Sequence, residues 1–275
     1  MRRALLLLPL ASGCAATLSG FQPAHVAEQG HLTAEVGWDV SAPTGTISRT
    51  FDAGKTLARA ANSRSLNDSE RRQVIEAGAN LAIDPPAAVM HAGLAFVPIR
   101  GWELALRWSS GAWRAGVRHQ FLYQDRHGVD LTMGLGVSRF SYEFPIHEVI
   151  NIIRLDDFTR WSLDIPLLVG KHDSWYRLWG GPRLIFSRYD SAMTLNLPAA
   201  GGSPAEVVAA SVGGNATFVG GQGGFALGYR HVFLGLELTI VRLISHAHLE
   251  LAGQRQDADL SGLIIYPGIA LMGEF

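Results

Sequence analysis

The sequence has little charge, almost no cysteine and no long hydrophobic run. Charged residues make up 17% of the 275 residues, below the roughly one quarter that is usual for globular domains. The 23 Lys and Arg residues nearly balance the 24 Asp and Glu residues, so we expect no nucleic-acid partner and no acidic tail. After the N-terminal segment, no apolar run approaches the ~20 residues that a membrane-spanning helix requires. These absences exclude a helical membrane protein.

The one cysteine, Cys14, lies in an N-terminal segment with the pattern of a secretory signal. Two arginines and a short apolar stretch precede small residues there. We expect residues 1–13 to be a signal peptide and residues 14–30 an N-terminal periplasmic segment. The stretch "LASGC" resembles the lipobox of bacterial lipoproteins, in which the cysteine is lipidated. Ala11 stands where that motif usually has Leu, so plain secretion stays an alternative to lipidation of Cys14.

Hydrophobicity alternates with period two along much of the remaining chain. In "HLTAEVGWDV" (31–40) and "VDLTMGLGVS" (129–138), large apolar residues occupy one face, and small or polar residues occupy the other. Each apolar face is about nine residues long, the length that a tilted strand needs to cross a bilayer. Ten such segments are expected, at residues 31–42, 86–98, 101–109, 112–124, 127–142, 160–171, 174–190, 214–229, 231–249 and 260–275.

The connections between these segments alternate between short turns and long loops. The long ones are expected at 43–85, 143–159, 191–213 and 250–259, with a short exception at 109–112. Together with an even strand number, this pattern predicts an all-β, antiparallel up-and-down transmembrane β-barrel of about ten strands over residues 31–275, with eight or twelve strands as alternatives. Both ends of the barrel domain then lie on the periplasmic, short-turn side.

A secreted β-sandwich is the rival all-β fold. Its solvated faces should be rich in Lys, Thr and Glu. Here the polar faces consist mainly of Gly, Ala and Ser, as in "GGQGGFALG" (220–228). Small residues suit the crowded interior of a narrow barrel. Aromatic residues also gather at the segment ends, as in the girdles of membrane barrels, which favours the barrel.

The signal segment, the alternating hairpins and the final strand ending in Phe275 resemble bacterial outer-membrane β-barrels. The motif "LSGFQPAHV" just after Cys14 is similar to predicted lipoprotein-type barrels. The resemblance implies a porin-like architecture in the bacterial outer membrane, surrounded by outer-membrane lipids. It further implies that Phe275 belongs to the signal read by the barrel-assembly machinery. It implies nothing about activity.

The charged residues on the polar faces are expected inside the barrel. Six acids and five arginines form this predicted lumen charge network: Glu35, Asp39, Glu103, Arg107, Arg114, Arg118, Asp130, Asp164, Arg177, Arg183 and Glu237. An unpaired charge in a confined interior is costly, so charges of opposite sign should pair and fill the lumen. The alternative is a polar pathway for a small solute. Ten strands are fewer than open porins use, so no general diffusion pore is expected.

The stretch "SHAHLE" requires a check for catalysis and for metal binding. It places His246, His248 and Glu250 on one face of a strand and Ser245 on the other. A nucleophile and a base on opposite faces cannot meet, and two histidines without a third ligand are a weak metal site. We therefore expect solvated residues at the outer rim, no catalytic residues, no metal and no cofactor.

Two of the long loops carry helical patterns. Over 51–82 a helical hairpin is expected, with Asp68 or Ser69 as an N-cap. It is expected either to cover the barrel mouth or to act as a gate, packing down through the apolar residues Leu57, Leu66, Val74 and Ile75.

The loop 144–158 is also expected to be helical. Ile146, Val149, Ile150 and Ile153 follow the spacing of one helix face. This stripe is expected to pack against its surroundings or, alternatively, to act as a ligand or gate loop that captures a hydrophobic molecule.

The sequence thus predicts an outer-membrane barrel, not an enzyme, with a structural or surface-recognition role and a largely filled lumen. A narrow channel or transporter for a small or hydrophobic molecule is the alternative. An outer-membrane lipid-modifying enzyme comes third.

Overall fold

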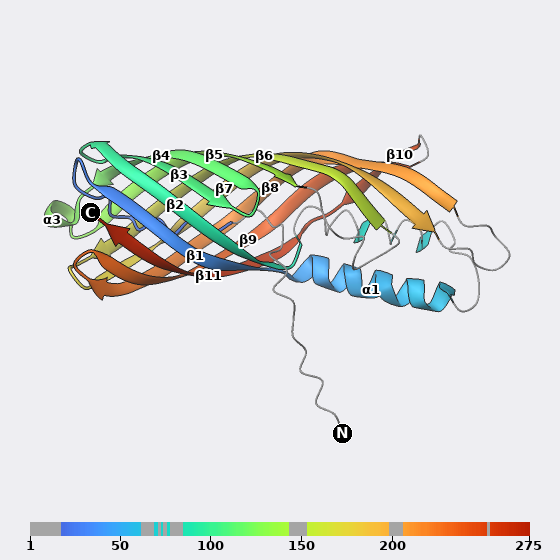
Figure 1. Cartoon of the computed structure of the whole chain (residues 1–275), viewed down its shortest axis with the longest axis horizontal. Helices are drawn as coiled ribbons and strands as arrows, with labels where there is room; N and C mark the ends of the chain where they lie inside the picture. The colour runs from blue at the N-terminus through green and yellow to red at the C-terminus, as the bar shows by residue number, and fades with distance from the viewer. Residues whose placement is uncertain are drawn as a thin grey trace, which may run out of the picture.

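The computed structural model describes residues 18–61, 69–70, 73, 76–77, 85–142, 153–197, 206–251 and 254–275. These residues form one long, antiparallel, curved sheet together with a helix that lies outside the barrel at one end (Figure 1). The strands are β1 (Leu32–Pro43), β2 (Ala87–Ile99), β3 (Trp102–Ser109), β4 (Ala112–Leu122), β5 (Asp130–Tyr142), β6 (Ile153–His172), β7 (Tyr176–Leu197), β8 (Glu206–Tyr229), β9 (Val232–Leu251), β10 (Gln254–Asp259) and β11 (Gly262–Glu274).

The sheet closes on itself into a barrel. Consecutive strands from β1 to β9 pair antiparallel, and β11 pairs with both β9 and β1. β10 pairs with residues 246–251 of β9, and β11 pairs with residues 232–243 of the same strand. Since β10 and β11 occupy consecutive stretches along one neighbour, they act as a single strand, and the barrel of the described residues has ten. The predicted fold class is confirmed.

The alternation of side chains separates an apolar outer belt from a polar interior. On β9, Val232, Leu234 and Leu236 are 42–54% exposed, whereas the intervening Phe233 and Glu237 are buried. Exposed apolar residues follow the same rule on the other strands around the barrel. A continuous apolar outer surface of this kind is stable against lipid and not against water. The barrel surface is therefore that of a membrane-spanning protein.

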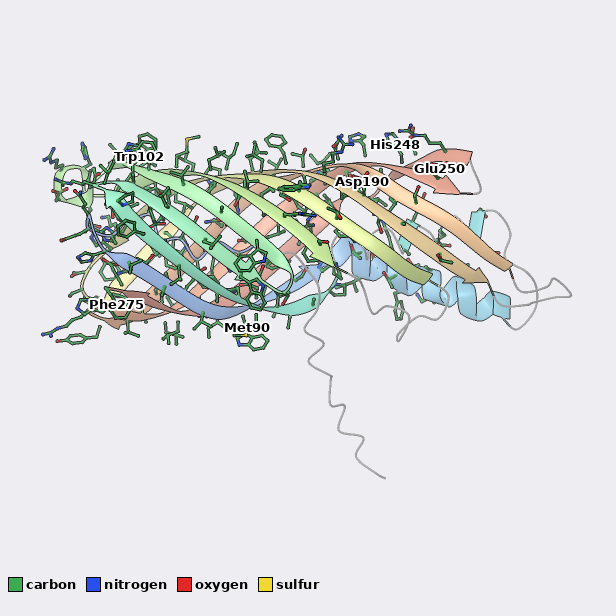
Figure 2. All side chains as sticks on the ribbon, turned by 45° about the horizontal axis from the view of Figure 1, so that its top comes forward. Met90, Trp102, Asp190, His248, Glu250 and Phe275 are labelled. Carbon is green, nitrogen blue, oxygen red and sulfur yellow. The ribbon has the colours of Figure 1, made fainter. Side chains whose placement is uncertain are left out.

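Aromatic side chains mark the ends of the apolar belt. At the end with the short turns, exposed rings are supplied by Trp102, Phe121, Trp175, Tyr229 and Phe275. Figure 2 shows Trp102 and Phe275 at the same end of the barrel, both directed outward. Short turns lie on the periplasmic side of such barrels. No helix within the described ranges is long and apolar enough to cross a membrane.

Four strands are much longer than membrane crossing requires. β6, β7, β8 and β9 have 20, 22, 24 and 20 residues, whereas about nine to eleven suffice to cross a bilayer. Figure 1 shows them continuing past the shorter strands at the end away from the C-terminus. We call the outer parts of β6–β9, together with β10, the extracellular extension. The connections expected at 143–159 and 191–213 are accordingly shorter, because strand pairing continues into both ranges.

The first long connection begins with helix α1 (Thr44–Ala61), which starts directly after β1 and therefore earlier than expected from the pattern over 51–82. The Thr44 hydroxyl donates to the Leu263 carbonyl at 3.1 Å, and Arg49 donates to the Ser261 carbonyl at 2.9 Å. These bonds tie the start of α1 to the start of β11. Ser69, Glu70, Gln73, Glu76 and Ala77 are helical as well.

The two helical parts of this connection are in contact, because the Thr56 hydroxyl hydrogen-bonds the Gln73 side-chain oxygen at 3.2 Å. Of the expected gate residues, Leu57 lies in α1, while Leu66, Val74 and Ile75 lie outside the described residues, as does Asp68. Ser69 is helical in the structure. A second short helix, α3 (Gln124–His127), forms the turn between β4 and β5.

Pro267 lies inside β11 although it cannot donate a backbone hydrogen bond. It pairs with Leu238 of β9. On the other side, the pairing of β1 runs from Asp39–Gly268 to Ala42–Ile265 in one unchanged register and skips the two positions between. The strand therefore tolerates the proline through a local gap in pairing, without a bulge.

Candidate functional site

The eleven charged residues of the predicted network all lie in the barrel interior. Nine of them, Asp39, Glu103, Arg107, Arg118, Asp130, Asp164, Arg177, Arg183 and Glu237, are at least nine-tenths buried. The side chains of Glu35 and Arg114 are 13% and 15% exposed. They come from seven different strands, so only closure of the barrel brings them together.

Asp164 organises the middle of the lumen. Arg183 of β7 binds it in two places, with Nε to Oδ1 at 2.9 Å and Nη2 to Oδ2 at 2.7 Å. Arg114 of β4 reaches the same Oδ2 atom at 2.5 Å. One carboxylate thus holds two guanidinium groups, and all three groups are largely shielded from water. Breaking such a pair leaves a buried charge, which is strongly destabilising.

A second cluster surrounds Arg107 of β3. Its guanidinium group contacts Glu35 at 3.2 Å and Asp39 at 3.2 Å, both on β1. Asp39 Oδ2 also lies at hydrogen-bond distance, 3.0 Å, from Nδ1 of the fully buried His91. Sequence reasoning did not identify His91, because a single histidine in an alternating strand carries no distinctive signal.

Two further pairs lie nearer the periplasmic end. Arg118 of β4 donates to Glu103 of β3 at 2.7 Å. Arg177 of β7 pairs with Glu274 near the end of β11. Glu274 was not among the predicted network residues, since it stands next to the terminal aromatic in the sequence. These two pairs leave both arginines neutralised at this end of the lumen.

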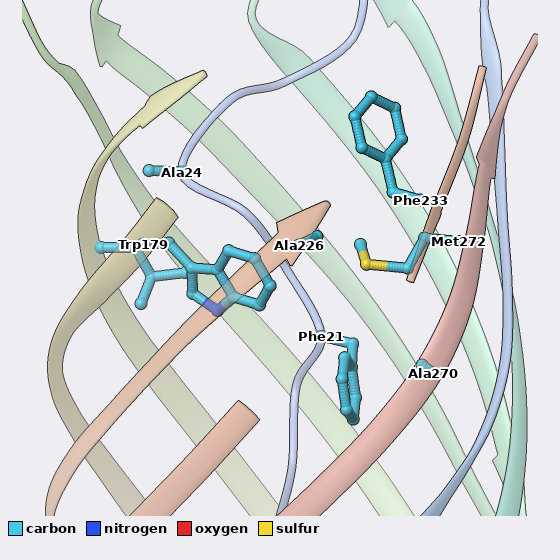
Figure 3. Packing of buried hydrophobic residues seen from close by; sticks show 8 residues of the cluster. Phe21, Ala24, Trp179, Ala226, Phe233, Ala270 and Met272 are labelled. Carbon is cyan, nitrogen blue, oxygen red and sulfur yellow. The ribbon is translucent and has the colours of Figure 1, made fainter. Parts of the chain in front are cut away.

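The periplasmic half of the lumen is filled by the chain's own N-terminal part. Residues 18–27 lie inside the barrel, and eight of these ten residues are buried. For residues 18–27 the structure therefore differs from the expected position in the periplasm, while residues 14–17 lie outside the described residues. We call residues 18–30 the lumenal segment. Figure 3 shows it as a narrow trace that passes between the strands and carries Phe21 and Ala24.

Wall side chains hold the backbone of the lumenal segment. Glu237 of β9 accepts hydrogen bonds from the backbone N–H groups of Gly20, at 2.6 Å, and Phe21, at 2.9 Å. The same carboxylate accepts a bond from the indole of Trp179 at 3.0 Å. Three donors converge on this one carboxylate, two of them from the segment, so Glu237 acts as an anchor for the segment.

Other members of the network donate to carbonyl groups of the segment. Arg183 reaches the carbonyl of Leu18, and Arg118 reaches the carbonyl of Pro23. The Gln120 side chain accepts from the Val26 backbone at 2.9 Å. The lumenal segment has no strand partner, so these side-chain contacts replace the ladder that its polar backbone groups would otherwise need.

The segment also packs through apolar side chains. Phe21 and Ala24 belong to a buried cluster with Leu168, Trp179, Ala226, Phe233, Ala270 and Met272 (Figure 3). Small wall residues make room for it. A Cβ added at Gly268 would lie 2.3 Å from Asp39 Oδ1 and 2.8 Å from the Phe21 ring. Glycine is therefore required there by the close approach of the segment.

Little space is left beside the lumenal segment. A cavity of about 60 Å³ lies next to Phe21, Glu35 and Arg107, which is room for about two water molecules. Among the described residues, the lumenal segment and the wall side chains occupy most of the interior at this level.

The interior of the extracellular end has a different character. It carries a cluster of buried rings, Phe140, Phe158, Tyr189 and Phe218, which we call the aromatic cluster. The ring centroids of Phe140 and Phe158 are 5.7 Å apart, and those of Phe158 and Tyr189 are 6.5 Å apart. The Arg160 guanidinium lies over the Phe140 and Phe218 rings at 5.7 and 6.0 Å.

Tyr189 also makes the polar contact of this cluster with Ser245, whose hydroxyl lies 2.8 Å from the Tyr189 hydroxyl. Burial raises the pKa of Tyr189, so the phenol stays protonated. As predicted, Ser245 lies on the opposite face of the strand from its neighbours. Ser245 is buried, whereas His246, His248 and Glu250 are exposed on the outer face.

The outer face of the extension is polar. Figure 2 shows Asp190, His248 and Glu250 on this part of the sheet. A shallow recess of about 700 Å³ lies there, lined among others by Arg188, Asp190, Asn215, His248 and Arg255. Both charge signs are present, and the residues lie beyond the apolar belt. This surface is the part of the described barrel best suited to contact polar groups outside the membrane.

Cys14 and the stripe residues Ile146, Val149 and Ile150 lie outside the described residues. Ile153 is the first residue of β6, so the helix expected over 144–158 does not include it. Strand pairing with Leu195 begins at Ile153 because β7 continues far enough to offer a partner.

Comparisons with known proteins give distant similarities to solved structures and assign no activity. No protein-family model matches the chain, and no curated protein matches it. Among solved structures, CarO of Acinetobacter baumannii has 9% identity and a TM-score of 0.36, covering 60% of this chain and 93% of that one. OprG, an outer-membrane protein of Pseudomonas aeruginosa, has 9% identity and a TM-score of 0.34, covering 89% and 96%. Ail, the attachment invasion locus protein of Yersinia pestis, has 10% identity and a TM-score of 0.29, covering 90% and 100%.

The strand pairing and the surface of this chain establish its class. A closed antiparallel barrel satisfies every ladder without an open edge, which is the condition for spanning a bilayer with strands. Its outer belt is apolar and its interior polar, as in bacterial outer-membrane proteins. The chain thus has the architecture of a closed, membrane-spanning antiparallel β-barrel.

Proposed function

We propose that this protein is a closed outer-membrane barrel with a structural or surface-recognition role, carried by its extracellular extension. The observation that carries the proposal is the lumenal segment, which occupies the barrel from the level of Asp164 to the periplasmic end. A barrel that fills its own lumen with ten buried or half-buried residues has little room for a solute. The long strands β6–β9 then remain as the distinctive feature.

The proposal includes no enzymatic activity. Ser245 faces the interior and is engaged by Tyr189, while the neighbouring histidines face outward. A nucleophile and its base cannot meet in this arrangement. Outer-membrane lipids are the proposed neighbours of the apolar belt. Phe275, 65% exposed at the periplasmic end, is the proposed contact for the assembly machinery.

Planar-bilayer conductance tests the closed state. We expect no stable single-channel currents from the wild-type protein, because the lumenal segment blocks the periplasmic half of the lumen. Steady currents from the wild type, with the signature of a folded barrel, would overturn the closed state. The matched control for a Glu237→Ala variant is Glu250→Ala, because Glu250 is an exposed glutamate of the same strand β9. Glu250→Ala should behave like the wild type.

A narrow channel for a small or hydrophobic molecule is the second candidate. It is favoured by one observation: the lumenal segment is held by side-chain contacts and not by strand pairing, so it can leave without opening the barrel wall. Glu237→Ala removes the acceptor of two of its backbone bonds. Currents in Glu237→Ala alone would identify a gated channel. Silence in both proteins supports the structural role.

Lipidation of Cys14 is a further part of the proposal, supported by the "LASGC" stretch. Leu18 already lies inside the barrel, and four extended residues reach at most ~14 Å. A lipid attached to Cys14 would therefore have to emerge from the lumen within ~14 Å of Leu18. Mass spectrometry of the mature N-terminus, for the wild type and for Cys14→Ser, tests this assignment directly.

A further inference from the structure

Three metal-binding side chains meet at the periplasmic mouth of the barrel. His25 belongs to the lumenal segment, Asp130 is the first residue of β5, and His172 is the last residue of β6. Each offers one ligand atom, and these atoms all lie within 4.8 Å of one another. The His25 and His172 rings are stacked, with centroids 3.7 Å apart. The three residues are far apart in sequence and meet only because the segment enters the barrel.

Asp130 is held in one orientation. Its Oδ1 atom accepts hydrogen bonds from the Gln120 side chain at 2.7 Å and from the Gln124 backbone at 2.9 Å. Its Oδ2 atom lies 2.6 Å from His172 Nδ1. The His172 Nδ1 atom and the Asp130 Oδ2 atom thus point at each other. An ion bound between them would displace the proton of this hydrogen bond, because metal ligands must be deprotonated.

The surrounding charges leave this carboxylate available to a cation. Arg118 and Arg177 are the nearby arginines, and they pair with Glu103 and Glu274. Among the ion pairs of the described residues, Asp130 has His172 as its partner and no arginine. The imidazole of His172 is 30% exposed, so an ion can reach the site from the periplasm.

We propose that His25, His172 and Asp130 bind one divalent transition-metal ion, with Zn²⁺ as the best fit. Two imidazole nitrogens and a carboxylate oxygen are ligands that Zn²⁺ accepts at about 2.0–2.2 Å, leaving a fourth position to water. Ligand atoms about 2.1 Å from a tetrahedral ion lie roughly 3.4 Å from one another, so the 2.6 Å between His172 Nδ1 and Asp130 Oδ2 would widen on binding. The bound ion would join the lumenal segment to β5 and β6. This inference goes beyond the proposed function and does not depend on whether the barrel conducts.

Zinc titration of the purified full-length barrel tests the site. The protein is prepared without a polyhistidine tag, stripped with a chelator and titrated with ZnCl₂ by calorimetry in detergent. We expect one ion per chain. His25→Gln and His172→Gln should each weaken binding at least about tenfold, and Asp130→Asn should weaken it by about 10–100-fold. His231→Gln, at another histidine of the periplasmic end, should leave binding unchanged.

Two results would overturn the proposal. One is the absence of saturable Zn²⁺ binding to the folded wild type. The other is unchanged binding in the His25→Gln, His172→Gln double variant together with loss of binding in a His246→Gln, His248→Gln variant, which would place the ion on the outer surface. Heat-modified migration in gels shows whether each variant is folded.

A measurement on the wild type keeps the test independent of variant folding. Diethyl pyrocarbonate modifies accessible histidines, and mass spectrometry locates the modified residues. Zn²⁺ should protect His172 and leave His231 reactive. Equal modification of His172 with and without Zn²⁺ contradicts the site.

Discussion

The two ends of the barrel interior are stabilised in different ways. The periplasmic half combines the apolar cluster around Phe21 with a charge network, in which Asp164, Glu237 and the arginines hold each other and the lumenal segment. The extracellular end is filled by the aromatic cluster, with Arg160 stacked on its rings and one phenol–hydroxyl contact. Both regions are buried, yet only the periplasmic half contains a network of charge pairs.

This difference follows from what fills each region. An extended segment brings backbone N–H and C=O groups into the lumen, and these groups need polar partners. The charged side chains of the barrel wall in the periplasmic half supply these polar partners. At the extracellular end, rings from the strands themselves meet across the interior, and apolar contact suffices. The charge network therefore serves the segment as much as the barrel wall.

The largest expected effect is in the periplasmic half. Asp164→Asn removes the charge that holds both Arg114 and Arg183, so the free energy of unfolding should fall by about 3–5 kcal/mol. Urea unfolding in lipid vesicles measures it. Asp190→Asn, at an exposed aspartate of the extension, should change it by less than about 0.5 kcal/mol. Equal changes in the free energy of unfolding at the two positions would contradict the conclusion that charge pairing stabilises the periplasmic half of the lumen.

An intermediate effect is expected where the segment touches the wall. Gly268→Ala places a methyl group against Asp39 and the Phe21 ring, and overpacking of this kind costs about 2 kcal/mol. Phe21 should also become more accessible to chymotrypsin. Gly262→Ala, on the same strand β11, meets its nearest atom at 3.6 Å and is the matched control. A tolerated Gly268→Ala with Phe21 still protected argues against the observed packing of the segment.

The smallest effect is expected in the aromatic cluster. Tyr189→Phe keeps the ring and removes the hydroxyl that contacts Ser245, so the free energy of unfolding should fall by about 1 kcal/mol. Tyr229→Phe, at a 68% exposed tyrosine of the periplasmic rim, provides the reference. A loss as large as that of Asp164→Asn would show that the extracellular end also depends on polar contacts.

Much of the barrel could be predicted from local pattern. Alternation along β9, from Val232 to Ile240, assigned each side chain to lipid or lumen, because side chains on a strand point to opposite faces in turn. The same rule placed Asp164 and Glu237 inside. Local pattern was misleading in loop 144–158. The apolar spacing there is typical of a helix, but the chain forms a strand from Ile153 onward. Pairing with a long neighbouring strand outweighed the local spacing there.

The strands, their two faces and the membrane-facing belt follow from local sequence, since these features depend on neighbours one or two residues away. What fills the lumen depends on contacts between distant parts of the chain. Gly20 and Glu237 are 217 residues apart, and His25 meets Asp130 and His172 only after the barrel has closed around the segment. Contacts of that range leave no periodic signal in the chain, because they depend on how distant strands are placed around a common interior.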